Sequence, residues 1–141
     1  MPANEDDGLA GALAQAAFMT MAVLSKAGAD HDLSLTQLRV LGILRDRRLR
    51  MTALADFLGL EKSTMSGLID RAEKRGLVQR APSAGDRRVV EVFLTPAGHE
   101  LAARFTGHVQ AALRPMTSQL TAAEQHRLQA LLERMTAGRE P

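Results

Sequence analysis

The side chains that could do chemistry in this 141-residue chain are mostly basic, and they gather in its middle. Residues 39–91 hold twelve Lys or Arg against seven Asp or Glu, so this segment has a net charge of +5 while the rest has −3. A polyanion would be attracted to the middle and repelled by the flanks. Soluble domains also carry solvated charges, so the charge pattern alone leaves both interpretations open. The basic residues of the segment are Arg39, Arg45, Arg47, Arg48, Arg50, Lys62, Arg71, Lys74, Arg75, Arg80, Arg87 and Arg88.

Residues of other reactive types form no pattern typical of catalysis. The chain has no cysteine, which excludes disulfides, thiolate zinc sites and thiol redox switches. No nucleophile motif, carboxylate pair or phosphate-binding glycine loop stands out. We therefore expect no enzyme and no cofactor. The four histidines leave a metal site as a minor alternative. It is minor because the histidines are scattered and follow no ligand spacing: His31, His99, His108 and His126.

A run of small polar residues opens a segment with helical periodicity, from Lys62 to Arg75. Small hydroxyl groups approach bases and phosphates closely and lysine supplies charge, so this end suits the major groove of DNA. Its inward face is predicted to be Met65, Leu68, Ile69 and Ala72. The predicted DNA contacts are Lys62, Ser63, Thr64, Ser66, Gly67 and Arg71, with Thr52 and Arg75 on the DNA backbone.

Two β-type runs follow, residues 77–81 and 89–94, and the segment between them is basic. This pattern predicts a hairpin whose tip offers Arg87 and Arg88 to a minor groove or to phosphates. Two helices joined by a tight turn and followed by a two-stranded wing form a device that reads duplex DNA. The tip residues Asp86, Arg87 and Arg88 are therefore predicted to bind DNA.

Further helices must position these parts. Periodicity predicts helices over 8–27, 35–44 and 51–58, the third capped by Thr52 and ended by Gly59. Gly76 is expected at the end of the 62–75 helix. Thr95 and Pro96 start a helix that runs to about Arg114, where Pro115 ends it. Residues 121–124 form a capping box before a final helix whose apolar residues are Leu128, Leu131, Leu132 and Met135.

The predicted fold is mainly α with a small β-hairpin wing: a winged helix-turn-helix flanked by N- and C-terminal dimerisation helices. We expect a disordered tail over 1–7, a dimerisation helix and linker over 8–32, the DNA-binding region over 33–95 and dimerisation helices over 96–137. The Ala-rich first helix is too apolar to be covered within one small domain, which favours a homodimer.

The cytoplasm is the expected location of this protein. The acidic start of the chain lacks a secretory signal, and we expect no run of about 18 uncharged apolar residues. No membrane partner is therefore predicted.

Three segments resemble the MarR family of bacterial regulators: residues 68–78, Asp86 to Arg88, and residues 92–98. The resemblance implies a two-fold dimer on DNA, with Ser63, Thr64 and Ser66 facing the major groove. It also implies that Arg88 enters the minor groove, held by an acidic partner such as Asp86 or Asp70. Many relatives carry a larger residue at the position of Gly67 and a hydroxyl cap at the position of Glu61, so both positions put the operator sequence in question.

The resemblance further implies a small aromatic or phenolic effector, bound in a crevice between the dimer helices and the DNA-reading part. The main hypothesis is a homodimeric regulator of double-stranded DNA, a repressor released by such an effector from a pseudo-palindromic operator. The alternative is a winged-helix protein-interaction adaptor with no operator. Candidate crevice residues are Phe18, Met21, Leu38, Arg39 and Phe105.

Overall fold

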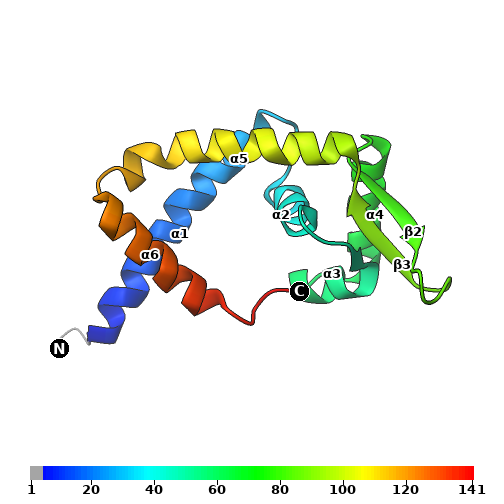
Figure 1. Cartoon of the computed structure of the whole chain (residues 1–141), viewed down its shortest axis with the longest axis horizontal. Coiled ribbons are helices and arrows are strands. Elements are labelled where there is room, and N and C mark those ends of the chain that lie inside the picture. Colours follow the sequence, from blue (N-terminus) through cyan, green and yellow to red (C-terminus); the bar gives the residue numbers. More distant parts are fainter. Residues whose placement is uncertain (1–4) are drawn as a thin grey trace.

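The computed structural model describes residues 5–141, with side chains from residue 8 onward. Within this range the chain forms six helices and a small sheet of three strands, which confirms the predicted fold class (Figure 1). The elements in chain order are α1 (Glu5–Ala29), α2 (Leu35–Leu44), β1 (Leu49–Arg50), α3 (Met51–Leu58), α4 (Lys62–Lys74), β2 (Val78–Pro82), β3 (Val90–Leu94), α5 (Pro96–Thr117) and α6 (Ala122–Thr136).

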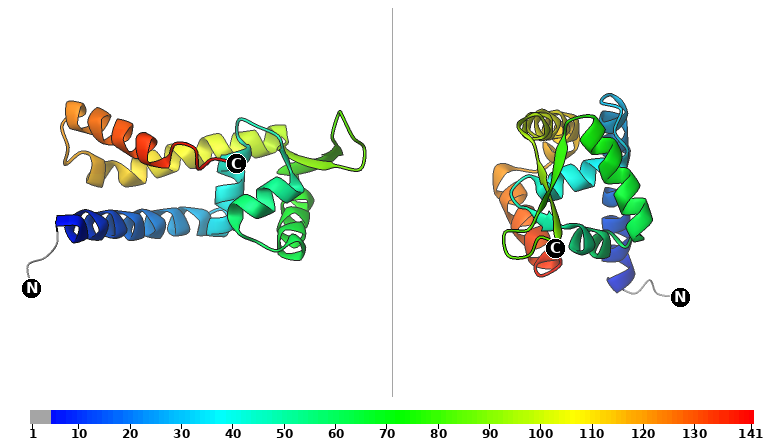
Figure 2. Two further views of the ribbon diagram at one scale, coloured as in Figure 1. Left: turned by 90° about the horizontal axis from the view of Figure 1, so that it is seen from below. Right: turned by 90° about the vertical axis from the view of Figure 1, so that its right-hand side faces the viewer.

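The molecule has a compact lobe and a looser helical end. We call α2, α3, α4 and the sheet the winged-helix lobe, and the β2–β3 hairpin the wing. Helix α5 runs from the base of the wing to the far end of the molecule, where α1 and α6 lie (Figure 1). Figure 2 shows α1 extending away from the lobe. This shape separates the wing from the helical end by the length of α5.

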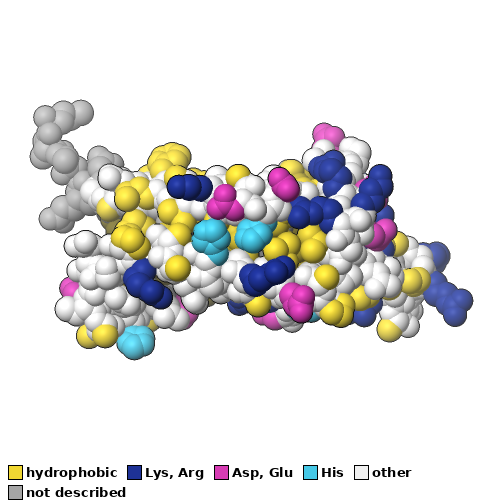
Figure 3. All heavy atoms as spheres, turned by 90° about the horizontal axis from the view of Figure 1, so that it is seen from above, with side chains coloured by type: hydrophobic (Ala, Val, Ile, Leu, Met, Phe, Trp, Pro, Cys, Tyr) yellow, Lys and Arg dark blue, Asp and Glu magenta, His cyan; other side chains and the backbone are white. Residues whose placement is uncertain are grey.

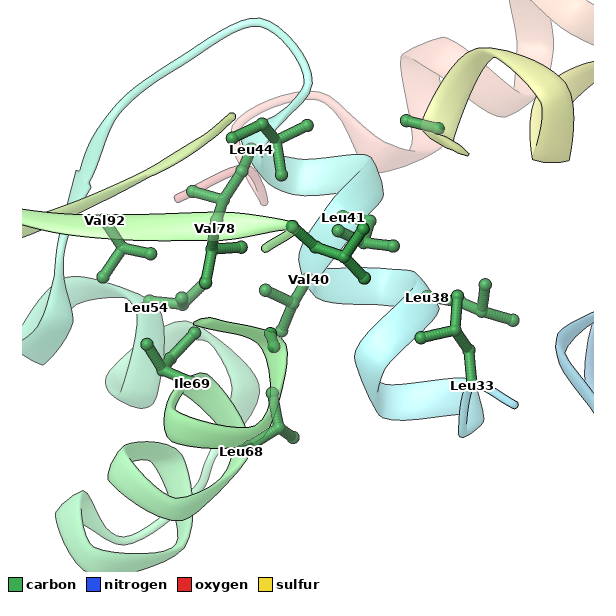
Figure 4. Packing of buried hydrophobic residues seen from close by; sticks show 14 of the residues in the cluster. Leu33, Leu38, Val40, Leu41, Leu44, Leu54, Leu68, Ile69, Val78 and Val92 are labelled. Atoms are coloured by element: carbon green, nitrogen blue, oxygen red, sulfur yellow. The ribbon is translucent and has the colours of Figure 1, made fainter. Parts of the chain in front are cut away.

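The hydrophobic core lies inside the winged-helix lobe (Figure 4). The four predicted inward residues of α4 are all buried, as are Leu38, Leu41 and Leu44 of α2. Each large apolar side chain buried in this way stabilises the fold by about 1.5–3 kcal/mol. The largest fully buried side chains are Leu44, Leu54, Met65, Ile69, Val40, Val78 and Val92. The core therefore fixes α4 against the sheet.

The sheet is antiparallel with the strand order β1-β3-β2. Both strands of the wing were predicted, and each begins one residue later than expected. Strand β1 was missed, because two residues are too few to show an alternating pattern. Leu49 of β1 and Arg80 of β2 pair with the same residue of β3, the fully buried Val92. Strand β3 is therefore paired on both sides, and β1 attaches the wing to the rest of the lobe.

The helix ends follow the predicted rules in most places. Gly59 ends α3 with φ 66°, and Gly76 follows α4 with φ 73°, both in the left-handed region that glycine tolerates. Thr95 caps α5 with Pro96 at the first helical position, and Thr121 forms the predicted capping box with Glu124.

Two predicted boundaries were wrong. Thr52 is not the cap of α3, because the helix already begins at Met51 and Arg50 occupies the cap position without a side-chain hydrogen bond. Pro115 does not end α5, which continues to Thr117. A proline excludes the helical conformation mainly at the residue before it, and here the helix tolerates it within its last turn.

Helix α5 meets the wing at a very close backbone approach. A Cβ atom added to Gly98 would lie 2.0 Å from the carbonyl oxygen of Leu77, so no larger residue fits there. Thr95 reinforces the same joint, because its hydroxyl donates to the Gly76 carbonyl and its backbone N–H donates to the Leu77 carbonyl. The base of the wing and the start of α5 are therefore rigidly connected.

Helix α1 departs from expectation in two ways. It begins at Glu5, so residues 5–7 of the predicted tail are helical, while residues 1–4 lie outside the described residues. From Gly8 to Ala29 it is also long and apolar enough to span a membrane, judged by length and composition alone. The prediction that no such run exists was wrong. Gly, Gln, Thr and Ser interrupt the apolar residues of this segment, but they add no charge, and the mean hydropathy of the segment stays high enough for a membrane span.

Candidate DNA interface and neighbouring crevice

Helix α4 presents its predicted DNA contacts on the outside of the winged-helix lobe. Lys62, Ser63 and Thr64 are exposed at its first turn, and Ser66 and Gly67 are half-buried. Glu61 occupies the cap position and makes no side-chain cap bond, so the backbone N–H groups of the first turn stay free to meet an anion. The hydroxyl-rich end of α4 is thus open to a ligand.

Arg71 lies beside the space that the missing side chain of Gly67 leaves open. A Cβ atom added to Gly67 would lie 3.6 Å from Nη1 of Arg71, which is an ordinary contact distance. The guanidinium therefore folds back along α4 toward the position that lacks a side chain. Arg71 stays exposed, so the glycine brings a cation closer to the reading end of the helix.

The wing holds Arg88 in a defined direction although its side chain is 91% exposed. Asp86 accepts hydrogen bonds from the Arg88 backbone N–H at 3.0 Å, from Nε at 3.3 Å and from Nη2 at 3.4 Å. These N–H groups, the backbone one first, hold the pKa of the Asp86 carboxyl below its ordinary value. Asp86 is therefore ionised near neutral pH and orients the guanidinium outward.

A groove of about 410 Å³ joins the wing to the helix-turn-helix. It contains three predicted contacts, Thr52, Ser66 and Arg88, which come from α3, α4 and the wing. It also contains two arginines that were not singled out, Arg50 and Arg80. Their membership in the basic segment was the only sequence signal for them. Most Lys and Arg side chains visible from above lie at this end of the molecule (Figure 3).

Two predicted roles do not fit the structure. Asp70 does not hold Arg88, because Asp70 forms its ion pair with Arg80 at 2.6 Å. Arg75 follows the other end of α4, and its guanidinium donates to the carbonyls of His31 and Asp32 at 2.8 and 2.9 Å. It therefore secures the turn between α1 and α2 and stands apart from the groove.

A second, mostly apolar crevice of about 230 Å³ lies between α2 and α5. Leu38 and Phe105 line it as predicted, whereas Phe18 and Met21 do not and are exposed. Arg39 also lies elsewhere, with its guanidinium 5.2 Å from the centre of the Phe57 ring.

The basic residue of the crevice is Arg45, whose Nη1 donates to the Thr106 hydroxyl at 3.3 Å. This role was missed because Arg45 occurs within a run of arginines. The crevice thus has apolar walls and one cationic end, lined by Leu24, Leu38, Leu41, Gly42, Arg45, Ala102, Phe105, Thr106, Val109 and Gln110.

Two of the four histidines approach each other. The rings of His31 and His108 lie 6.1 Å apart, edge to face, beside Phe105. Among the described residues no group of three or more His, Cys, Asp or Glu is placed to hold a metal ion. The two rings make an aromatic contact at the turn that Arg75 secures.

Comparison with known proteins places this geometry in a family. A family model described as MarR family matches residues 31–89. The homoprotocatechuate degradative operon repressor of Escherichia coli is 30% identical over 132 residues, which cover 93% of this chain and 89% of that repressor. The chain belongs to the MarR family. Its relatives are transcription regulators, so this MarR-family protein is a DNA-binding transcription regulator, as predicted, rather than an adaptor.

Other matches cover different extents of the MarR-family chain. The regulator YfiV of Bacillus subtilis is 42% identical over 65 residues, which span 45% of this chain and 41% of YfiV. A mutant E. coli MarR complexed with operator DNA has a TM-score of 0.70 and 25% identity, covering 94% of this chain and 96% of that one. A Rhodococcus sp. RHA1 regulator shares the fold, with a TM-score of 0.78, 22% identity and coverage of 95% and 96%.

Proposed function

We propose that this MarR-family regulator acts as a homodimeric repressor in the cytoplasm and reads a pseudo-palindromic operator with α4 and the wing of each protomer. The observation that carries this proposal is the groove in which Thr52, Ser66, Arg50 and Arg88 converge from α3, α4, β1 and the wing. Hydroxyls at a helix start and an oriented, exposed arginine suit two adjacent grooves of one duplex.

The helical end supports the proposed dimer. Not one side chain of α6 is buried against the rest of the described chain, although Leu128, Leu131 and Leu132 form one apolar face. That face opens onto Leu9 and Leu13 of α1 across a groove of about 570 Å³. An isolated helix of 15 residues is marginal in water, so α6 needs further apolar cover. A second copy, contributing the same face by two-fold symmetry, supplies it.

Sedimentation of the purified chain tests whether a second copy covers the apolar face of α6. We expect a dimer at micromolar concentration, and we expect Leu131→Glu to shift the protein to monomers without unfolding the winged-helix lobe. The control is Leu35→Glu, which places the same charge at an exposed position of α2. A monomeric wild type would contradict the proposed dimer. Partition of the wild type into lipid vesicles would show that α1 meets a membrane instead.

Selection from a random duplex library tests the proposed operator. A dimer with two-fold symmetry should enrich two inverted half-sites about one helical turn apart, near 34–36 Å. Enrichment of a single unrepeated half-site would contradict the dimeric reading. No enrichment would contradict sequence-specific binding by this chain.

We further infer that the crevice between α2 and α5 binds a small aromatic carboxylic acid that releases the DNA. Its walls suit an aromatic ring, and Arg45 beside Thr106 suits a carboxylate. The name of the E. coli relative, which concerns degradation of an aromatic acid, agrees with this class. Titration with benzoate-type acids should weaken operator binding. Arg45→Met should abolish that response, whereas Arg39→Met, outside the crevice, should retain it.

A further inference from the structure

Arg80 in β2 makes the shortest ion pair among the described residues. Its side chain is only 27% exposed, and Nη2 lies 2.6 Å from Oδ1 of Asp70. The same nitrogen donates to the carbonyl oxygen of Ser66 at 3.1 Å. Nη1 lies 4.0 Å from Oε1 of Glu73, and the Arg80 backbone N–H donates to the other oxygen of that carboxylate at 3.3 Å. One arginine of the wing thus contacts three residues of α4.

The three partners form one stripe along α4. Ser66, Asp70 and Glu73 are separated by four and three residues, and residues at these spacings lie on the same face of a helix. This face turns toward β2, because Arg80 reaches all three. The chain also joins α4 to β2 through the tight turn at Gly76. Helix and strand are therefore connected at the turn and again through Arg80.

The hydrophobic core already holds α4 against the sheet, and Arg80 adds a polar restraint on the angle between the helix and the wing. The angle between α4 and the wing sets the distance from the hydroxyl-rich start of α4 to Arg88 at the wing tip. Arg80 also lines the groove that contains Ser66 and Arg88, two of the predicted DNA contacts. We propose that Arg80 is a positioning residue, which locks the wing to α4 at the spacing required for simultaneous contact with a major groove and the adjacent minor groove. This inference rests on the proposed DNA contacts.

A direct contact between Arg80 and a phosphate is the competing explanation. The two roles predict opposite effects of removing the charge on Asp70. If Arg80 binds phosphate, Asp70→Asn removes a repulsive charge beside DNA and tightens binding. If Arg80 positions the wing, the same change loosens the wing and weakens operator binding. Pre-organisation acts most strongly where both contacts must be made together, so binding to unrelated duplex is affected least.

The experiment measures Kd by fluorescence anisotropy on the selected operator and on a scrambled duplex, at several salt concentrations. We expect Asp70→Asn and Arg80→Gln each to weaken operator binding about fivefold, the combined effect of losing a partly exposed charged hydrogen bond in both protomers of the dimer. Binding of the scrambled duplex should weaken less than twofold, and the salt slope of Arg80→Gln should equal that of the wild type. The double variant should lose no more than the larger single loss, because each single change already breaks the same connection.

Glu61→Gln is the matched control. Glu61 is an exposed acid at the start of the same helix, and it forms no ion pair with any described residue. Its neutralisation should tighten binding to both duplexes. Thermal melting confirms that each variant is folded.

Equal or tighter operator binding by Asp70→Asn would overturn the positioning role. A fall in the salt slope of about 0.9 per half-site in Arg80→Gln would identify a phosphate contact and overturn it as well. Equal binding of operator and scrambled duplex by the wild type would contradict the proposed function, and the positioning role would fail with it.

Discussion

Replacing Arg88 with alanine removes an oriented cation at the wing tip without disturbing the core. Its side chain is 91% exposed and its partner Asp86 lies two residues away on the same tip, so the folded protein loses no packing. The melting temperature should therefore stay within about 1 °C of the wild type, as is usual for a surface substitution. The effect should appear in DNA binding alone.

The size of the effect follows from the number of contacts. Each dimer presents two copies of Arg88, and an oriented arginine in a DNA groove contributes about 1–2 kcal/mol. Losing both should weaken operator binding by about 30-fold to 900-fold. Each cation that displaces counterions also contributes about 0.9 to the salt slope, so the slope should fall by up to about 1.8. Anisotropy titrations between 50 and 300 mM salt, on the order of physiological strength, measure both quantities.

Two neighbouring variants separate orientation from charge. Arg87→Ala removes an equal charge from the same tip, but Arg87 has no hydrogen-bond partner in the described part of the chain. We expect it to weaken binding by less than tenfold. Asp86→Ala keeps the Arg88 charge and releases its orientation, so its effect should be intermediate. A loss for Arg88→Ala no greater than that for Arg87→Ala would refute the reasoning that orientation by Asp86 matters.

Three further predictions concern the scaffold and the pH. Gly67→Ala should raise the urea midpoint, because removing a mid-helix glycine stabilises α4 by about 1 kcal/mol and the new Cβ makes only ordinary contact with Arg71. If the backbone at Gly67 meets DNA, the same substitution should also lower operator affinity. An unchanged Kd would exclude that close approach. Gly98→Ala should lower the melting temperature by at least 4 °C or so, since a Cβ 2.0 Å from the Leu77 oxygen forces the joint apart; an unchanged melting curve would show that the joint is soft. The backbone N–H and hydroxyl of Thr121 lower the pKa of the Glu124 carboxyl, so this carboxylate stabilises the fold at neutral pH. The advantage in urea over Glu124→Gln should begin to shrink near pH 4.5, the ordinary value, and should be lost once the pH has fallen through the lowered pKa of the folded protein. An advantage that does not shrink as the pH falls below 4.5 would contradict the assigned cause.

Local rules were enough to predict most of the fold. The spacing of Leu38, Leu41 and Leu44 gave α2 its predicted bounds, and all three residues are buried. The helix ends at Gly76 and Thr95 follow from glycine at a left-handed position and a hydroxyl at a cap. These features depend on residues within four positions of each other, so the sequence displays them directly. The two-residue β1 has no such pattern and could not be found.

Side-chain partners were harder to predict, because they depend on which elements pack together. Arg80 and Ser66 are fourteen residues apart, and their residue types do not indicate the contact that they make across the Gly76 turn. Arg75 was expected on DNA, but packing of α4 places it against carbonyls more than forty residues earlier in the chain. Arg39 and Arg45 are alike in sequence, and only the orientation of α2 decides which one meets the crevice.

Because of the close approach at Gly98, helix α5 is rigidly joined to the base of the wing and tilts together with it. Its 22 residues span about 33 Å, so a tilt of about 5° around Gly98 moves the far end by roughly 3 Å, close to the rise of one base pair. Phe105 of the crevice lies in the half of α5 nearer to the wing, and Val109 lies just beyond the midpoint of the helix. Under the proposed function, a ligand that widens the crevice by a fraction of an ångström would tilt α5 together with the winged-helix lobe, and this tilt would move the two α4 helices of the dimer out of register with the duplex.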